Sequence, residues 1–140
     1  MNHRAIELYL NNTLKEESVD PRIRPYLESA KKAIKDLNIK PLLIEPHLYH
    51  PSLLFAGTPD LLTTKKILID WKTGSHMPQT IFQAGGYISL LEENKYKVKQ
   101  VYEIVLGEKG YKLYEYKPHR SRGLFAAALS IYGWRKKKNV

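Results

Sequence analysis

The sequence predicts a mixed α/β fold, in which a central β-sheet of about five strands is flanked by helices. Two observations lead to this prediction. Three strand-like segments follow one another in the first half of the chain, and a helical segment then separates them from two more. Consecutive strands followed by a crossover helix favour a mixed sheet over a purely alternating parallel one. At 140 residues with 43% apolar content, the chain is expected to form a single domain around one core.

Helices are expected at the start of the chain, over residues 1–40. Residues 3–17 have a helical pattern, and Asp20-Pro21 provides a cap and first-turn pair for a second helix that runs to about Leu37. One face of this second helix collects apolar side chains, which predicts packing against the sheet.

The sheet core is expected over residues 41–117. Its first three strands are assigned to residues 41–49, 53–62 and 66–72, and Gly57 and Pro59 interrupt the second.

A crossover helix is expected over residues 78–93, followed by strands over 98–106 and 111–117. The glycines at 107 and 110 indicate a hairpin between these two strands. The last segment, 118–140, is assigned to a basic amphipathic helix over about 121–137. The predicted order is α-β-β-β-α-β-β-α, with two helices making up the first α segment.

Composition restricts the chemistry. The chain has no cysteine, which excludes disulfides, cysteine-bound zinc and iron–sulfur clusters, so any metal must use oxygen or imidazole ligands. No stretch approaches the roughly 20 apolar residues of a membrane span, and the first residues lack the pattern of a signal peptide. We expect an intracellular, cytoplasmic protein without a membrane partner, in the host cytoplasm if the source is viral.

The net charge of +9 is typical of a domain whose surface meets phosphate, and charge alone indicates nucleic-acid binding and an ordinary basic surface about equally. Cations in rows at strand or helix spacing form surfaces that follow a nucleic-acid backbone. Taken singly, each such run is also typical of an ordinary solvated surface. The predicted DNA contacts are Lys95, Lys97, Arg120, Arg122, Arg135 and Lys136.

Charged residues at the end of an apolar strand mark the candidate site. Asp70 and Lys72 lie two residues apart in the third strand, so both point to the same face, while Trp71 points to the other. Asp60 lies at the end of the preceding strand segment. Carboxylate and carbonyl oxygens suit Mg²⁺ or Mn²⁺, so Asp60, Asp70 and the carbonyl of Trp71 are predicted metal ligands. Lys72 is predicted to act beside the metal.

Glu45, on the first strand, is a third acidic candidate that assists the first metal or helps to hold a second. Alternatives remain for each residue: Asp70 and Lys72 form a strand-end ion pair, Asp60 belongs to an ordinary turn, and Glu45 lines a solvated strand face. A buried ion pair is a poor source of stability, because removing both charges from water costs several kcal/mol per ion.

Gln83 and Tyr87 are four residues apart on the crossover helix, so they share a face. The pair Gly85-Gly86 between them costs roughly 1 kcal/mol per glycine relative to alanine, which indicates close packing by another element. Tight helix packing with a polar residue nearby is the alternative to a role in the site.

These residues together resemble a known family. Glu45, Gly57-Thr-Pro-Asp60, Ile69-Asp-Trp-Lys72-Thr-Gly74 and Gln83-Ala-Gly-Gly-Tyr87 are similar, in order and spacing, to the motifs of the RecB-like exonuclease branch of the PD-(D/E)XK nuclease superfamily. The resemblance implies a restriction-endonuclease-like core over the single domain 1–140. It also implies that Asp60 and Asp70 bind Mg²⁺ or Mn²⁺, that Lys72 is catalytic with Glu45 assisting, and that Gln83 and Tyr87 contact the active site or DNA. Relatives with an iron–sulfur cluster are disfavoured by the missing cysteines.

The expected function is therefore a metal-dependent DNA nuclease that hydrolyses phosphodiester bonds, using one or two ions. An exonuclease acting in DNA repair, recombination or phage or viral DNA processing fits the helix motif best. A structure-specific endonuclease of the junction-resolvase kind is an alternative that would require a homodimer. A non-catalytic nucleic-acid-binding module is a second alternative.

Overall fold

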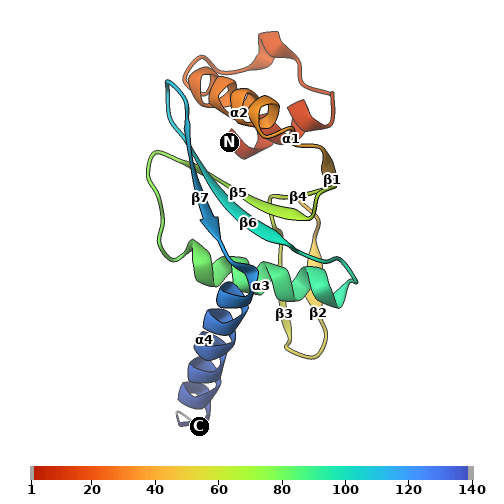
Figure 1. Cartoon of the computed structure of the whole chain (residues 1–140), viewed down its shortest axis with the longest axis vertical. Coiled ribbons are helices and arrows are strands. Elements are labelled where there is room, and N and C mark those ends of the chain that lie inside the picture. The colour runs from red at the N-terminus through yellow and green to blue at the C-terminus, as the bar shows by residue number, and fades with distance from the viewer. Residues whose placement is uncertain (1, 139–140) are drawn as a thin grey trace.

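The computed structural model describes residues 2–138, with side chains over residues 3–133, and Figure 1 shows the arrangement. Two helices come first, a group of five short or medium strands follows, and a helix, two strands and a final helix complete the chain. The elements are α1 (Asn2–Leu10), the short 3₁₀ helix η1 (Glu16–Ser18), α2 (Arg24–Asp36), β1 (Pro41–Ile44), β2 (Leu48–His50), β3 (Phe55–Gly57), β4 (Leu61–Thr63), β5 (Ile67–Thr73), α3 (Thr80–Glu93), β6 (Gln100–Leu106), β7 (Tyr111–Tyr116) and α4 (Pro118–Lys138).

Five strands form the main sheet in the order β1-β4-β5-β6-β7, and β2 and β3 form a separate hairpin. Neighbouring strands of the sheet are antiparallel except for β5 and β6, which run parallel. Helix α3 connects this parallel pair, as a crossover connection must. The prediction of a mixed five-stranded sheet flanked by helices is confirmed.

Helices cover both faces of the sheet (Figure 1). On one face, α1 and α2 pack against a core that includes Ile69 and Trp71 of β5. On the other face, α3 packs against a second core that includes Leu68, the residue of β5 before Ile69. Side chains therefore alternate between the two cores along β5, which places Asp70 and Lys72 on the α3 face.

Helix α4 extends away from the sheet and packs against α3 (Figure 1). A Cβ added at Gly85 would lie 2.1 Å from the backbone oxygen of Ser121, and one at Gly86 would lie 3.0 Å from the ring of Phe125. The two glycines of α3 thus allow the close approach of α4. No helix in the described part of the chain is long and apolar enough to cross a membrane.

Three of the expected elements were wrong in extent. The first helix ends at Leu10 rather than residue 17, and a turn with Asn12 at φ +59° follows it. The strands expected over 41–49 and 53–62 are each divided in two, because the chain leaves the main sheet after Ile44 to form the β2–β3 hairpin and returns at Leu61. The break lies at Glu45, whose φ is +45°.

Candidate metal and catalytic site

Backbone contacts bring Glu45, Asp60 and Trp71 together at one end of β4 and β5. Asp60 immediately precedes β4, and its Oδ2 accepts a hydrogen bond from the backbone N–H of Trp71 at 2.8 Å. The backbone oxygen of Asp60 accepts a hydrogen bond from the N–H of Glu45 at 2.9 Å. The carboxylates of Glu45 and Asp60 are therefore fixed on adjoining segments, as the sequence predicted.

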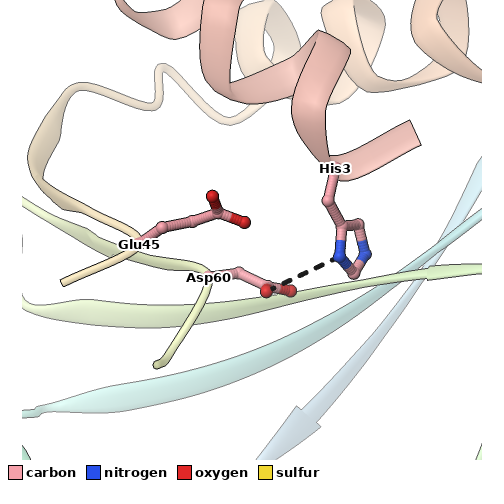
Figure 2. Close-up of side chains that lie close together, drawn as sticks. All are labelled: His3, Glu45 and Asp60. Carbon is pink, nitrogen blue, oxygen red and sulfur yellow. Dashed lines mark ion pairs between the residues drawn. The ribbon is translucent and has the colours of Figure 1, made fainter. Parts of the chain in front are cut away.

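His3 lies beside the carboxylates of Glu45 and Asp60, and it was not predicted. Its Nδ1 lies 3.8 Å from Asp60 Oδ1, and its Nε2 lies within hydrogen-bonding distance, 2.8 Å, of the carbonyl oxygen of Trp71. One ligand atom each from His3, Glu45 and Asp60 lies within 4.8 Å of the others, as Figure 2 shows. Within the described residues, this is the group of side chains best placed to hold a cation.

A helical pattern in the first residues could have identified His3. His3, Ile6, Glu7 and Leu10 follow helical spacing, and all four line the same small pocket as Asp60 and Trp71. A histidine and a glutamate four residues apart on an otherwise apolar helix face are a recognisable signal. That signal does not indicate which residues His3 contacts, because Asp60 and Trp71 lie more than 50 residues further along the chain.

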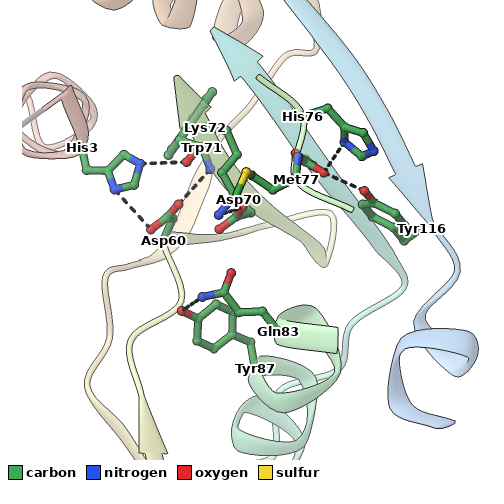
Figure 3. A network of polar contacts seen from close by, with 11 residues as sticks. His3, Asp60, Asp70, Trp71, Lys72, His76, Met77, Gln83, Tyr87 and Tyr116 are labelled. Carbon is green, nitrogen blue, oxygen red and sulfur yellow. Dashed lines mark hydrogen bonds and ion pairs between the residues drawn. The ribbon is translucent and has the colours of Figure 1, made fainter. Parts of the chain in front are cut away.

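Asp70 and Lys72 form the part of the site that faces α3 (Figure 3). The Nζ of Lys72 lies 3.0 Å from Asp70 Oδ2. The Lys72 ammonium group is the ion-pair partner of this buried carboxylate oxygen, which accepts no hydrogen bond from any other described residue. Asp70 is only 8% exposed, so the ion pair leaves a desolvated oxygen that a cation or a donor would stabilise.

The carboxyl groups of the site resist ionisation. The pKa of Asp60 is raised to about 6, mainly by burial and also by the nearby carboxylates of Asp70 and Glu45, while His3 and the Trp71 N–H act in the opposite direction. Burial also raises the pKa of Asp70, although Lys72 lowers it. Closely spaced desolvated carboxylates of this kind are typical of cation sites and of catalytic sites.

Glu45 has a carboxylate neighbour of its own. Burial raises the pKa of Glu45, and the adjacent Glu7 of α1 raises it further. Hydrogen bonding with Glu45 in turn lowers the pKa of Glu7. Glu7 is thus a further acidic residue at the edge of the site that was not predicted.

Gln83 and Tyr87 lie on α3 and face the two aspartates (Figure 3). The Nε2 of Gln83 donates a hydrogen bond to Tyr87 Oη at 3.0 Å. Burial raises the pKa of Tyr87, and the charges of Asp60 and Asp70 contribute. The predicted placement of this pair beside the carboxylates therefore agrees with the geometry.

A buried glutamate, also unpredicted, holds the loop that follows β5. Glu103 of β6 is fully buried and lies next to Asp70 in the parallel register. Its carboxylate accepts hydrogen bonds from the Tyr116 hydroxyl at 2.6 Å, the Met77 N–H at 2.9 Å and His76 Nδ1 at 2.9 Å. The loop between Lys72 and α3 is fastened to the sheet in this way (Figure 3).

The predicted DNA contacts are dispersed. Lys95 and Lys97 precede β6 at the end of the sheet where β5 begins, and the next residues anchor there through the hydrogen bond from the Lys99 N–H to the Lys66 oxygen. A strand rises about 3.3 Å per residue, so this end is about 20 Å from Lys72. The structure does not bring these two lysines to the site.

The arginines of α4 differ from one another. Arg122 donates two hydrogen bonds of 2.9 Å to the carboxylate of Glu92, which ties α4 to α3. Arg120 is exposed and lines a pocket with Ile81, near the start of α3. The side chains of Arg135 and Lys136 lie outside the described residues.

The donor set fits a divalent cation. Asp60 and Glu45 offer carboxylate oxygens, His3 offers an imidazole nitrogen, and the carboxylate of Asp70, which is ion-paired with Lys72, lies on the adjoining strand. Carboxylates and one imidazole suit Mn²⁺ or Mg²⁺, whereas the softest metals prefer sulfur ligands. The carbonyl of Trp71, a predicted ligand, faces His3 in this structure.

Comparison with known proteins adds no identification. No protein-family model matches the chain, and no curated protein matches its sequence.

Proposed function

We propose that this chain is a metal-dependent nuclease that hydrolyses phosphodiester bonds in DNA. The observation that supports the proposal most strongly is the convergence of Asp60, Asp70 and Lys72, with His3 and Glu45, on one end of the β4–β5 pair. Carboxylates are desolvated there, and the ammonium group of Lys72 lies 3.0 Å from one of them. This combination suits an anionic ester substrate.

Each residue has a role that its position supports. A bound Mg²⁺ or Mn²⁺ would neutralise phosphate charge and lower the pKa of an attacking water. Asp60, Asp70, Glu45 and His3 would hold the ion. The ammonium group of Lys72, already at the Asp70 carboxylate, would orient the water or stabilise charge that develops on the phosphate.

Gln83 and Tyr87 would contact the substrate from α3. Their hydrogen bond fixes both side chains toward the aspartates, and the high pKa of Tyr87 keeps its hydroxyl able to donate to a phosphate oxygen. The pair would position the nucleic acid rather than take part in the chemistry.

The finer assignment rests on the resemblance in sequence. We infer a restriction-endonuclease-like core of the RecB-like branch, which favours an exonuclease acting on DNA ends. The mixed sheet, with the carboxylates on its β4–β5 pair and the Gln83-Tyr87 helix beside them, is compatible with that assignment.

The test is a cleavage time course on end-labelled linear, circular and branched DNA with Mg²⁺, Mn²⁺ or EDTA. We expect linear DNA to be cut when either metal is present and to survive in EDTA. Asp70→Ala and Lys72→Ala should each reduce the rate at least about 100-fold, because positioned metal ligands and charge-stabilising groups contribute on that order.

A matched control is Lys65→Ala, which removes one exposed lysine in the turn before β5 and should cleave at the wild-type rate. Cutting of circular DNA would replace the exonuclease assignment by an endonuclease. DNA that is bound but left intact under every metal condition would contradict the proposal and indicate a binding module.

A further inference from the structure

A second concave region lies next to the candidate site. It is a pocket of about 550 Å³ between the loop after β5 and the β6–β7 hairpin, two elements that are visible in Figure 1. The lining residues are Gly74, Ser75, His76, Val105, Gly107, Lys109, Gly110, Tyr111, Lys112 and Tyr114. Gly74 is only two residues after Lys72, so the pocket adjoins the site along the chain as well as in space.

Strand register connects the pocket to the catalytic lysine. Lys72 of β5 is paired with Val105 of β6, and Val105 is paired with Lys112 of β7. Residues directly opposite each other on neighbouring strands point to the same face, so Lys72 and Lys112 share the α3 face of the sheet. Two strand spacings separate them by about 10 Å.

The charge of the pocket is positive and uncompensated. Lys109 and Lys112 are exposed, and neither makes an ion pair with a described residue. No acidic residue lines the pocket. A Cβ added at Gly74 or Gly110 would meet nothing within 4 Å, so an extended ligand can approach the backbone there.

The wall between the pocket and the site is rigid. The ring of His76 stacks on that of Tyr114, with centroids 4.1 Å apart, and His76 is also held by the buried Glu103. A ligand in this pocket would therefore meet an ordered wall, with the two exposed ammonium groups of Lys109 and Lys112 beside it.

We propose that this pocket binds the phosphate groups of the nucleic-acid strand that flank the bond being cleaved, with Lys109 and Lys112 as the phosphate contacts. The inference rests on the proposed function, because it takes the substrate to be a nucleic-acid strand. A rise of 3.4 Å per nucleotide in B-DNA makes the 10 Å between Lys72 and Lys112 equivalent to about three nucleotides of a duplex strand, and to fewer of an extended one. The lysines thus contact phosphates within the first few nucleotides beside the site.

The test measures how binding depends on salt. An Asp70→Asn background prevents cleavage, and an end-labelled single-stranded oligonucleotide is titrated by fluorescence anisotropy from about 50 to 200 mM KCl. The slope of log K against log salt is negative, and each lost phosphate contact reduces its magnitude by about 0.7 for a single strand. The double variant with Lys109→Ala and Lys112→Ala is expected to bind more weakly and to reduce the magnitude of the slope by about 1.4.

The matched control removes the same charge elsewhere. Lys40 and Lys65 are exposed residues beside the turn that precedes β5, and Lys40→Ala with Lys65→Ala should leave the slope unchanged. The conservative pair Lys109→Arg and Lys112→Arg should retain the wild-type slope, and thermal unfolding confirms that every variant is folded. An unchanged slope in the Lys109/Lys112 variant would overturn the inference, as would an equal loss in the control pair.

Cleavage assays separate the two proposals. In the active background, loss of Lys109 and Lys112 is expected to raise KM with little change in kcat. If the wild type cuts DNA, but removing the two lysines leaves the salt slope of binding unchanged, only the pocket assignment is contradicted. If the protein never cuts DNA, but removing Lys109 and Lys112 still reduces the salt dependence of binding as expected, the nuclease proposal is contradicted and the pocket assignment is supported. A loss found instead with Lys95→Ala and Lys97→Ala would move the phosphate surface to the other end of the sheet.

Discussion

The carboxyl group of Asp60 is unfavourable to the fold when no cation is bound. Its pKa rises from 3.8 to about 6, mainly through burial. Between these two pH values the folded protein retains a proton that the unfolded chain has lost. The contribution of Asp60 to stability is therefore highest below pH 4, decreases as the pH rises toward 6, and stays low above that.

Asp60→Asn should remove this penalty, because the amide oxygen can still accept the hydrogen bond from the Trp71 N–H. In EDTA at pH 7 the variant should be more stable than the wild type by about 2 to 3 kcal/mol. The difference should shrink toward zero near pH 4. Urea unfolding at both pH values measures it, and a difference that is constant with pH would contradict the assigned burial effect.

At the residue scale, the sequence identified the side chains whose signal is local. Asp70 and Lys72 stand out because an apolar strand carries few charges, and their shared face follows from the period of two. His3 and Glu103 could not be placed in the same way. Their partners, Asp60 and the loop near Met77, are distant in sequence and meet them only through the packing of α1 and the pairing of β5 with β6.

The contact between α3 and α4 depends on a glycine. An added Cβ at Gly85 would overlap the Ser121 backbone, and neither helix can yield without losing contacts. Gly85→Ala is expected to destabilise the protein by about 1 to 3 kcal/mol, the usual cost of overpacking.

Gly123→Ala in α4 is the control, because a Cβ there meets nothing within 4 Å. It should be neutral or stabilising by up to about 1 kcal/mol through helix propensity. Thermal and urea unfolding of the two variants measure the contrast. Equal effects would mean that α4 does not pack on Gly85 in solution.

The loop after β5 depends on the hydrogen bonds of Glu103. Tyr116→Phe removes the 2.6 Å hydrogen bond to this buried carboxylate and should cost about 1.5 to 3 kcal/mol, as for bonds to charged groups. Tyr114→Phe is the matched control on the same strand, since its hydroxyl makes no hydrogen bond to a described residue. Urea unfolding compares the two, and a loss of the same size in both would contradict the assigned network.

At the element scale, periodicity predicted the strand at 66–72, the crossover helix and the β6–β7 hairpin within a few residues. Gly57 and Pro59 indicated the interruption of the second expected strand, although not that its first part pairs with β2 outside the main sheet. The first expected strand was not divided, because its division depends on Glu45 adopting a left-handed backbone. Glutamate rarely adopts that conformation, and no local pattern indicates it. The adjacent Pro46 was the one available sign that pairing stops there.

The site as a whole draws on α1, the bend after β1, the segment that leads into β4, β5 and α3, so it exists only in the folded protein. A cation that binds this arrangement and not the unfolded chain must stabilise the fold by mass action. At a Mn²⁺ concentration ten times the dissociation constant, the gain is about 1.4 kcal/mol. For a domain of this size that corresponds to a rise in Tm of a few degrees.

Differential scanning calorimetry with and without Mn²⁺ tests this expectation, and Asp60→Asn provides the control. The rise should be absent or much smaller in the variant, which lacks a charged ligand. The same rise in both proteins would show that the ion binds elsewhere.

The position of His3 has a practical consequence for work with this protein. Its imidazole belongs to the cation group and comes from the first turn of α1 (Figure 2). A polyhistidine tag fused ahead of it would place several competing imidazoles within reach of Asp60. Purification by immobilised nickel could then load the site with a foreign ion or hide it altogether. An affinity tag placed after α4, or one removed by proteolysis, avoids both effects.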